Sequence, residues 1–228
     1  MKYIIANWKS NKTREEIEHW VDRFEQLLKA QPVGEQVAAI IAPPFPSLMF
    51  VSNRLLDREL HAQTFLAVQD ISPFPAGSYT GAVSARNLDG FNVKYAIVGH
   101  SERRRYFHET HQEIANKVSQ CLENGITPIL CIDEEYVFDQ AGAMTKDQLG
   151  KCIVAYEPLS AIGTGQNEPI DHVIEVRDRI KKVFGENVPI LYGGSVTEEN
   201  FQEYLDMCDG LLIGGASLDA VKFSKLLV

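Results

Sequence analysis

Eight short apolar runs, rich in β-branched residues, recur along the whole chain. Each run is continuous and does not alternate with polar residues, which is typical of parallel strands buried on both faces. The runs cover residues 3–6, 37–41, 65–68, 95–98, 126–132, 152–155, 188–191 and 211–213. We therefore predict eight strands that pair in parallel.

Helical patterns lie between these runs. Thr13 and Glu16 form a capping box, and the apolar residues that follow them repeat at the spacing of one helix face. Two further amphipathic segments, residues 114–122 and 170–184, run up to a glycine that suits the position just after a helix. The chain therefore reads as strand followed by helix, repeated.

A closed (β/α)8 barrel is the economical solution for this order, because each parallel strand pair needs a crossover connection and no Pro-, Gly- or Ser-rich linker divides the chain. Residues 1–228 are then a single domain. An open doubly wound sheet is the alternative. It is disfavoured because no G-x-G-x-x-G follows the first strand.

The charge of the chain restricts its partners. A formal net charge of −9 and a pI near 5.2 give no basic footprint for nucleic acid or an anionic membrane surface. No apolar run approaches the roughly 18 residues of a membrane span, and no signal peptide pattern opens the chain, so we expect a cytoplasmic protein. The four cysteines form no C-x-x-C pair and lie in apolar stretches, which indicates buried thiols.

Polar residues follow several of the predicted strands directly. Lys9 comes after the first strand, His100 after the fourth and Glu157 after the sixth, while glycine pairs at 193–194 and 214–215 follow the seventh and eighth. Each feature alone has an ordinary explanation: a surface lysine, a structural histidine, a salt-bridging glutamate or a tight turn. In a barrel, however, all of them meet at the carboxyl ends of the strands, where active sites lie.

Together these residue types favour proton abstraction next to a carbonyl. Glycine pairs let backbone N–H groups approach a phosphate closely. A desolvated Glu157 gains basicity, a neutral His100 near a helix start can donate to a carbonyl, and Lys9 can stabilise the charge of an enediolate. We therefore expect a phosphorylated carbonyl substrate.

The same segments carry a resemblance to a known family, in order and over nearly the whole chain. Its motifs are Asn7-Trp8-Lys9 and residues 99–104, 155–158, 161–165, 192–196 and 212–218. In these segments the chain resembles triosephosphate isomerase, a TIM-barrel enzyme. The resemblance implies interconversion of dihydroxyacetone phosphate and D-glyceraldehyde 3-phosphate, with Glu157 as base, His100 as proton shuttle and Lys9 as charge stabiliser.

The resemblance also implies roles for further residues. Asn7 would orient the substrate and His100, and Glu102 would support the lysine. Residues 158–168 would form a closing lid, latched by Tyr192 and Ser195. The residues that would contact the substrate around its phosphate are Ile162, Gly163, Ser195, Leu212, Gly214 and Gly215.

Several positions depart from the family pattern. Ser160 replaces a tryptophan and residues 166–168 differ from the usual Lys-Thr-Ala, so both hinges of the lid are altered. The segment between the fifth and sixth strands is short, which predicts that its helix is truncated or missing. Asp70 stands where an asparagine is common, and Ala82 stands where a glutamate is common.

Residues 69–82 are too long and too apolar for a simple connection and match in length the family's loop that reaches into a neighbouring subunit. We therefore expect a homo-oligomer, a dimer that the uncovered surface after the fifth strand can extend to a tetramer. No metal and no organic cofactor is expected. Two alternatives stay open: another phosphosugar isomerase or epimerase, and a barrel that is a non-catalytic interaction module.

Overall fold

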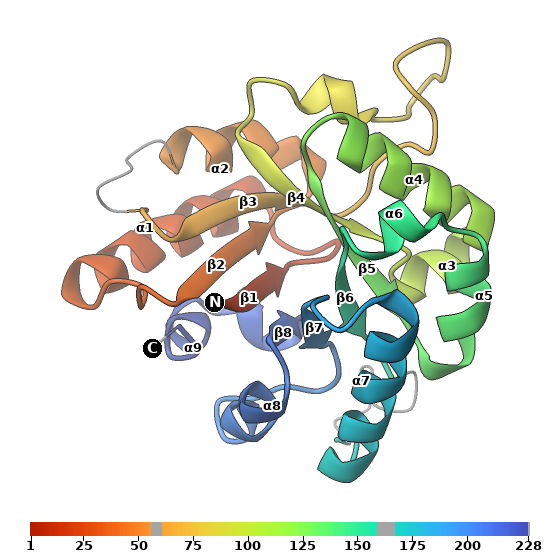
Figure 1. Ribbon diagram of the computed structural model, residues 1–228. Coiled ribbons are helices and arrows are strands. Elements are labelled where there is room, and N and C mark those ends of the chain that lie inside the picture. The colour runs from red at the N-terminus through yellow and green to blue at the C-terminus, as the bar shows by residue number, and fades with distance from the viewer. Residues whose placement is uncertain (56–60, 159–166, 228) are drawn as a thin grey trace.

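The computed structural model describes residues 1–55, 61–158 and 167–227. Eight parallel strands form a closed barrel in sequence order, β1 to β8, so the predicted (β/α)8 architecture is confirmed (Figure 1). The strands are β1 Lys2–Asn7, β2 Val37–Ala42, β3 Thr64–Val68, β4 Val93–Val98, β5 Thr127–Ile132, β6 Ile153–Tyr156, β7 Ile190–Tyr192 and β8 Gly210–Ile213.

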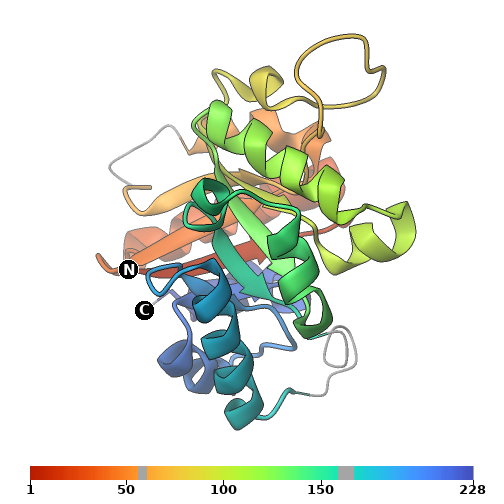
Figure 2. The ribbon, with the colours of Figure 1, turned by 45° about the vertical axis from the view of Figure 1, so that its right-hand side comes forward.

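Helices follow most of the strands and pack around the barrel (Figures 1 and 2). Among the described residues between β3 and β4, the structure has only the short turn of helix η2 Ala85–Leu88, where the repeat of strand and helix predicts a full helix. The described helices are α1 Arg14–Ala30, α2 Leu48–Arg54, α3 Ser101–Phe107, α4 His111–Glu123, α5 Val137–Gly142, α6 Lys146–Leu149, α7 Ile170–Phe184, α8 Phe201–Met207 and α9 Ala220–Ser224. The Thr13 capping box begins α1 as predicted, and Gly185 ends α7.

The core explains why the strands are continuous apolar runs. One cluster of buried side chains, which includes Ile5, Ile40 and Ile129, consists of strand residues only and fills the barrel. A second cluster, which includes Ile4, joins the outer faces of the strands to the helices. Successive residues on one strand point to opposite faces, so both must be apolar.

The barrel closes where β8 lies beside β1. Gly210 pairs with Tyr3, and a Cβ on Gly210 would lie only 2.0 Å from the Tyr3 carbonyl oxygen. Any larger residue would push the two strands apart. Glycine is therefore required at this seam.

The segment between β5 and β6 contains a short turn of helix, η3 Glu134–Tyr136, and the short helices α5 and α6. With six and four residues, both are far shorter than the fifteen-residue α7, so no long helix lies among the described residues of this connection. None of the described helices is long and apolar enough to cross a membrane.

Candidate active site

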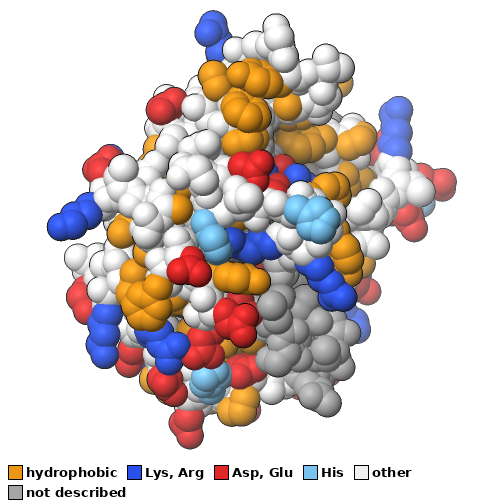
Figure 3. Space-filling view, turned by 90° about the vertical axis from the view of Figure 1, so that its right-hand side faces the viewer, with side chains coloured by type: hydrophobic (Ala, Val, Ile, Leu, Met, Phe, Trp, Pro, Cys, Tyr) orange, Lys and Arg blue, Asp and Glu red, His pale blue; other side chains and the backbone are white. Residues whose placement is uncertain are grey.

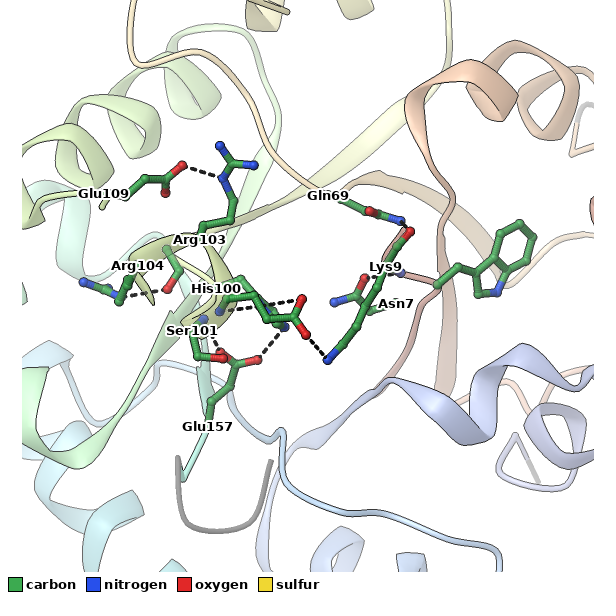
Figure 4. Close-up of polar contacts among 12 residues, drawn as sticks. Asn7, Lys9, Gln69, His100, Ser101, Arg103, Arg104, Glu109 and Glu157 are labelled. Carbon is green, nitrogen blue, oxygen red and sulfur yellow. Dashed lines mark hydrogen bonds and ion pairs between the residues drawn. The ribbon is translucent and has the colours of Figure 1, made fainter. Parts of the chain in front are cut away.

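The polar residues that follow β1, β4 and β6 meet at the carboxyl ends of the strands (Figure 4). Lys9, His100 and Glu157 all lie there, as the sequence predicts. In Figure 3, which faces this side of the molecule, charged and histidine side chains gather near the middle of the surface.

His100 lies between two hydrogen-bonding partners. It is the N-cap of α3, and its Nδ1 accepts a hydrogen bond from the backbone N–H of Glu102 at 3.2 Å. On the other side of the ring, Nε2 lies 3.0 Å from Glu157 Oε1. Since Nδ1 accepts, the proton of a neutral ring belongs on Nε2, which donates toward Glu157.

Glu157 is buried, with 2% of its surface exposed. Its second oxygen, Oε2, accepts a hydrogen bond from the backbone N–H of Ser101 at 3.0 Å. Burial by itself would raise the pKa of Glu157, but attraction to His100, the hydrogen bonds from His100 and the Ser101 N–H, and the positive charge of Lys9 together lower this pKa.

The pKa of His100 changes in the opposite direction. Burial by itself lowers this pKa, and attraction to the Glu157 carboxylate raises it overall. The amide of Glu102 opposes protonation of Nδ1, because an imidazolium has no acceptor nitrogen. The two side chains therefore form a coupled acid and base pair.

Lys9 has a left-handed backbone, with φ of 50°. Such a conformation is uncommon outside glycine and must be held by its surroundings. The N–H of Lys9 donates to Asn7 Oδ1 at 3.1 Å, and Gln69 Nε2 donates to the Lys9 carbonyl at 3.0 Å. The ammonium group lies 2.6 Å from Glu102 Oε1, which places Glu102 beside the lysine as predicted.

The glycine turns after β7 and β8 border the same residues. A Cβ on Gly193 would lie 3.0 Å from Glu157 Cγ, and one on Gly214 would lie 3.3 Å from Lys9 Cε. The backbone can therefore come close to both groups only because these residues lack side chains.

The structure describes only some of the other residues that are predicted to contact the substrate. Leu212 is buried inside the barrel, Ser195 is half-buried, and Gly215 begins the turn η4 Gly215–Leu218. Ile162 and Gly163 lie outside the described residues, as do the replaced Ser160 and most of the predicted lid. Tyr192, one of the predicted latch residues, accepts a hydrogen bond on its hydroxyl from the N–H of Glu168 at 3.3 Å.

Three supporting contacts were not predicted from the sequence: the amide of Ser101, the side chain of Gln69, and Arg104. Arg104 donates from Nε to the carbonyl of Gly99 at 2.8 Å and from Nη2 to the carbonyl of Cys131 at 3.1 Å. It thereby joins the ends of β4 and β5 beneath α3. In the sequence, Arg104 stood out only as a member of the motif formed by residues 99–104.

A cavity of about 520 Å³ adjoins the catalytic candidates, lined in part by Lys9, Ser101, Glu102 and Glu157. Such a volume accommodates a small molecule. Among the described residues, no group of three or more His, Cys, Asp or Glu side chains could hold a metal ion.

Comparison with known proteins identifies the family. A family model described as triosephosphate isomerase matches residues 2–228. The triosephosphate isomerase of Mesomycoplasma hyorhinis is 39% identical over 98% of this chain and 96% of its own length. That of Mesomycoplasma hyopneumoniae (strain 232) is 37% identical over 100% and 98%, and that of Thermus thermophilus is 38% identical over 98% and 96%. The chain, with its closed barrel and its acid and base residues at the strand ends, therefore belongs to the triosephosphate isomerase family.

Proposed function

We propose that this chain interconverts dihydroxyacetone phosphate and D-glyceraldehyde 3-phosphate through an enediolate. Membership of the family makes it an aldose-ketose isomerase, an intramolecular oxidoreductase. The observation that carries the specific mechanism is the buried Glu157 in contact with His100, at 3.0 Å, at a cavity that Lys9 also lines. This arrangement supplies a base, a proton donor and a cation to one small site.

Glu157 takes a proton from C1 of dihydroxyacetone phosphate. The electron pair of that C–H bond forms the C1=C2 double bond of the enediolate, and the π pair of the C2 carbonyl moves to its oxygen. His100 Nε2–H donates to this oxygen, and Lys9 stabilises the negative charge that develops. Return of the proton from Glu157 to C2 gives the aldehyde. His100 moves a proton between the two oxygens, so the overall reaction consumes no oxidant or reductant.

The contacts of Glu157 support this role. Its carboxylate takes hydrogen bonds from His100 and from the Ser101 amide, and these keep its pKa low. A substrate carbonyl competes with Glu157 for the His100 proton. Once that hydrogen bond is lost, burial dominates and raises the pKa of Glu157, so that it becomes a stronger base next to the substrate.

We assign phosphate binding to the backbone N–H groups of Ser195, Gly214 and Gly215, with Gly163 of the lid, and apolar contacts to Ile162 and Leu212. Closure of residues 158–168 over the substrate would exclude water from the enediolate. Asn7 holds the Lys9 backbone, which supports its assignment as an orienting residue. No metal or organic cofactor takes part in this proposal.

We infer that residues 1–228 form one domain, because β1 pairs with β8. We also propose a homodimer formed through residues 69–82. This loop projects from the barrel in both ribbon views, between β3 and β4 (Figures 1 and 2). At its tip Phe74 and Tyr79 are 45% and 43% exposed and stack with their ring centroids 4.6 Å apart.

A groove of about 490 Å³ on the same chain provides a receptor for such a loop from a second copy. Its apolar lining includes Phe45, Ile71, Val83 and Phe107. The groove also has charged lining residues, Asp70, Arg103, Glu109, Glu113 and Lys117, so the two aromatic rings would pack against its apolar part, where their burial is favourable. Phe138, which is 64% exposed on the shortened segment, supports extension of the dimer to a tetramer.

A substrate of sugar phosphate metabolism supports a location in the cytoplasm.

An assay of the purified chain with each triose phosphate, coupled to a dehydrogenase specific for the product, tests the function. We expect conversion in both directions with kcat/KM within the usual enzymatic range of about 10⁴ to 10⁸ M⁻¹s⁻¹. Activity on a larger phosphosugar alone would favour another isomerase or epimerase. Absence of any conversion would favour a non-catalytic interaction module.

A further inference from the structure

Helix α3 carries much of the site although it buries no side chain of its own. His100 is its N-cap, its Ser101 amide binds Glu157, and its Glu102 carboxylate pairs with Lys9. None of its seven residues is buried. Apolar packing therefore does little to fix this helix, and polar contacts must hold it in place.

Two arginines of α3 make those contacts. Arg104 bonds the strand carbonyls, as described above. Arg103 points the other way: its Nη2 lies 3.0 Å from Asp70 Oδ2, and its Nε donates to Glu109 (Figure 4). Lys117 of α4, which is 2% exposed, places its ammonium 2.5 Å from both Asp70 Oδ1 and Glu109 Oε1.

Asp70 is also joined to the other half of the site through its neighbour in the chain. Gln69 donates to the carbonyls of Lys9 at 3.0 Å and Ala42 at 2.8 Å. Two consecutive residues after β3 therefore reach both partners of the Lys9–Glu102 ion pair. Gln69 bonds the lysine backbone, and Asp70 bonds the helix that carries the glutamate.

We propose that Asp70 is a positioning residue for the reaction: through Arg103 it holds α3 so that Glu102 stays on Lys9 and the Ser101 amide stays on Glu157. This inference rests on the proposed function, for which those contacts prepare the site. Asp70 touches no reacting atom in it. It contacts α3 through Arg103, and its second ion pair, with Lys117, joins the same cluster to α4.

The charges of the cluster support the inference. Arg103 and Lys117 are balanced by Asp70 and Glu109, and a buried cation that loses its partner is strongly destabilising. Ala82 lines the same groove as these four residues. Asp70 and Ala82 thus border one groove, and of the two only Asp70 carries a carboxylate. A carboxylate placed at 82 would enter the same groove, where it could take over the charge of Asp70.

The test is Asp70→Asn, which keeps the shape of the side chain and removes its charge. We expect kcat to fall about tenfold or more, because small displacements of catalytic groups cost rate steeply, and KM to change less than about threefold. Adding Ala82→Glu to this variant should restore most of kcat. Hydrogen exchange of residues 101–107 should become faster in Asp70→Asn, which reports on α3 without any assay of activity.

Glu25→Gln is the matched control. Glu25 pairs with Arg54 and has 17% of its side chain exposed, against 18% for Asp70, but it lies on α1, away from the site. This control should lower the melting temperature and leave kcat and the exchange of α3 unchanged. If Asp70→Asn fails to fold, Arg103→Lys tests the same link, since it keeps the charge and loses the forked contact.

The proposal is overturned if Asp70→Asn lowers only the melting temperature, with kcat and the exchange of residues 101–107 as in the wild type. It is also overturned if Ala82→Glu brings no recovery while Glu25→Gln lowers kcat as much. An inactive wild type would instead refute the proposed function, and the exchange measurement would still decide whether Asp70 holds α3.

Discussion

Replacement of Glu157 by glutamine separates proton transfer from the shape of the site. The side chain is 2% exposed, and among the described residues its oxygens face the donors His100 Nε2–H and the Ser101 N–H. Glutamine offers one acceptor oxygen and one NH₂ group. With the oxygen on Ser101, the NH₂ group faces His100 Nε2, which can accept only if the ring proton moves to Nδ1.

That tautomer is disfavoured, because the Glu102 amide donates to Nδ1 at 3.2 Å. One buried polar contact is therefore lost, which costs about 1 to 3 kcal/mol of stability. The effect on rate is larger. A positioned general base contributes about 10²- to 10⁴-fold, and at about 1.36 kcal/mol for each factor of ten its loss raises the barrier by about 2.7 to 5.4 kcal/mol.

Steady-state kinetics of Glu157→Gln in the coupled assay, with thermal unfolding in parallel, measure both quantities. Glu25→Gln serves as a control for loss of a partly buried carboxylate far from the site. We expect kcat to fall at least a hundredfold while KM changes little. A variant that retains more than about a tenth of the wild-type kcat would show that Glu157 is not the base, because the activation barrier would then have risen by less than about 1.4 kcal/mol.

Three further perturbations probe the same account. Gly193→Ala brings a Cβ to 3.0 Å from Glu157 Cγ, so we expect kcat to fall about tenfold or more. The control is Gly142→Ala, whose Cβ meets no atom within 4 Å and should leave kcat unchanged. Equal kcat values for the two variants would show that the added Cβ does not displace Glu157. Tyr79→Asp places a charge at the proposed dimer contact, so we expect light scattering to show monomers and kinetics to show much reduced activity. A wild type that is monomeric and fully active would contradict the proposed dimer. In Glu157→Gln we expect the pKa of His100 to fall, because burial then acts without the attraction of the carboxylate. NMR of the imidazole ring during a pH titration measures this pKa. A pKa that is unchanged or higher in the variant would show that Glu157 does not raise it.

The sequence predicted the barrel because its strands are buried on both faces. Where a strand carries a charge, its boundary was less clear: β4 begins at Val93, two residues before the predicted run, and the exposed Lys94 interrupts the apolar pattern. Gly210 begins β8 for a reason that only the neighbouring strand supplies, the close approach of the Tyr3 carbonyl. Local pattern thus identified the elements, and tertiary contacts decided their ends.

The sequence predicted those residues of the candidate site that directly follow the ends of strands. It did not predict the contacts that hold these residues in place, because such contacts join distant parts of the chain or involve backbone groups. The Ser101 amide would bind Glu157 whatever its side chain, and Gln69 reaches Lys9 across 60 residues of sequence. Asp70 was recognised only as a departure from the family, and its pairing with Arg103 and Lys117 required the fold.

The central claim is that a proton leaves the substrate to Glu157 and returns by way of an enediolate. Turnover of dihydroxyacetone phosphate in D₂O, followed by proton NMR, tests it most directly. We predict that the product and recovered substrate contain solvent deuterium at the carbon next to the carbonyl, and that Glu157→Gln loses exchange and conversion together. Conversion by the wild type without any deuterium uptake would indicate direct hydride transfer and would contradict the account.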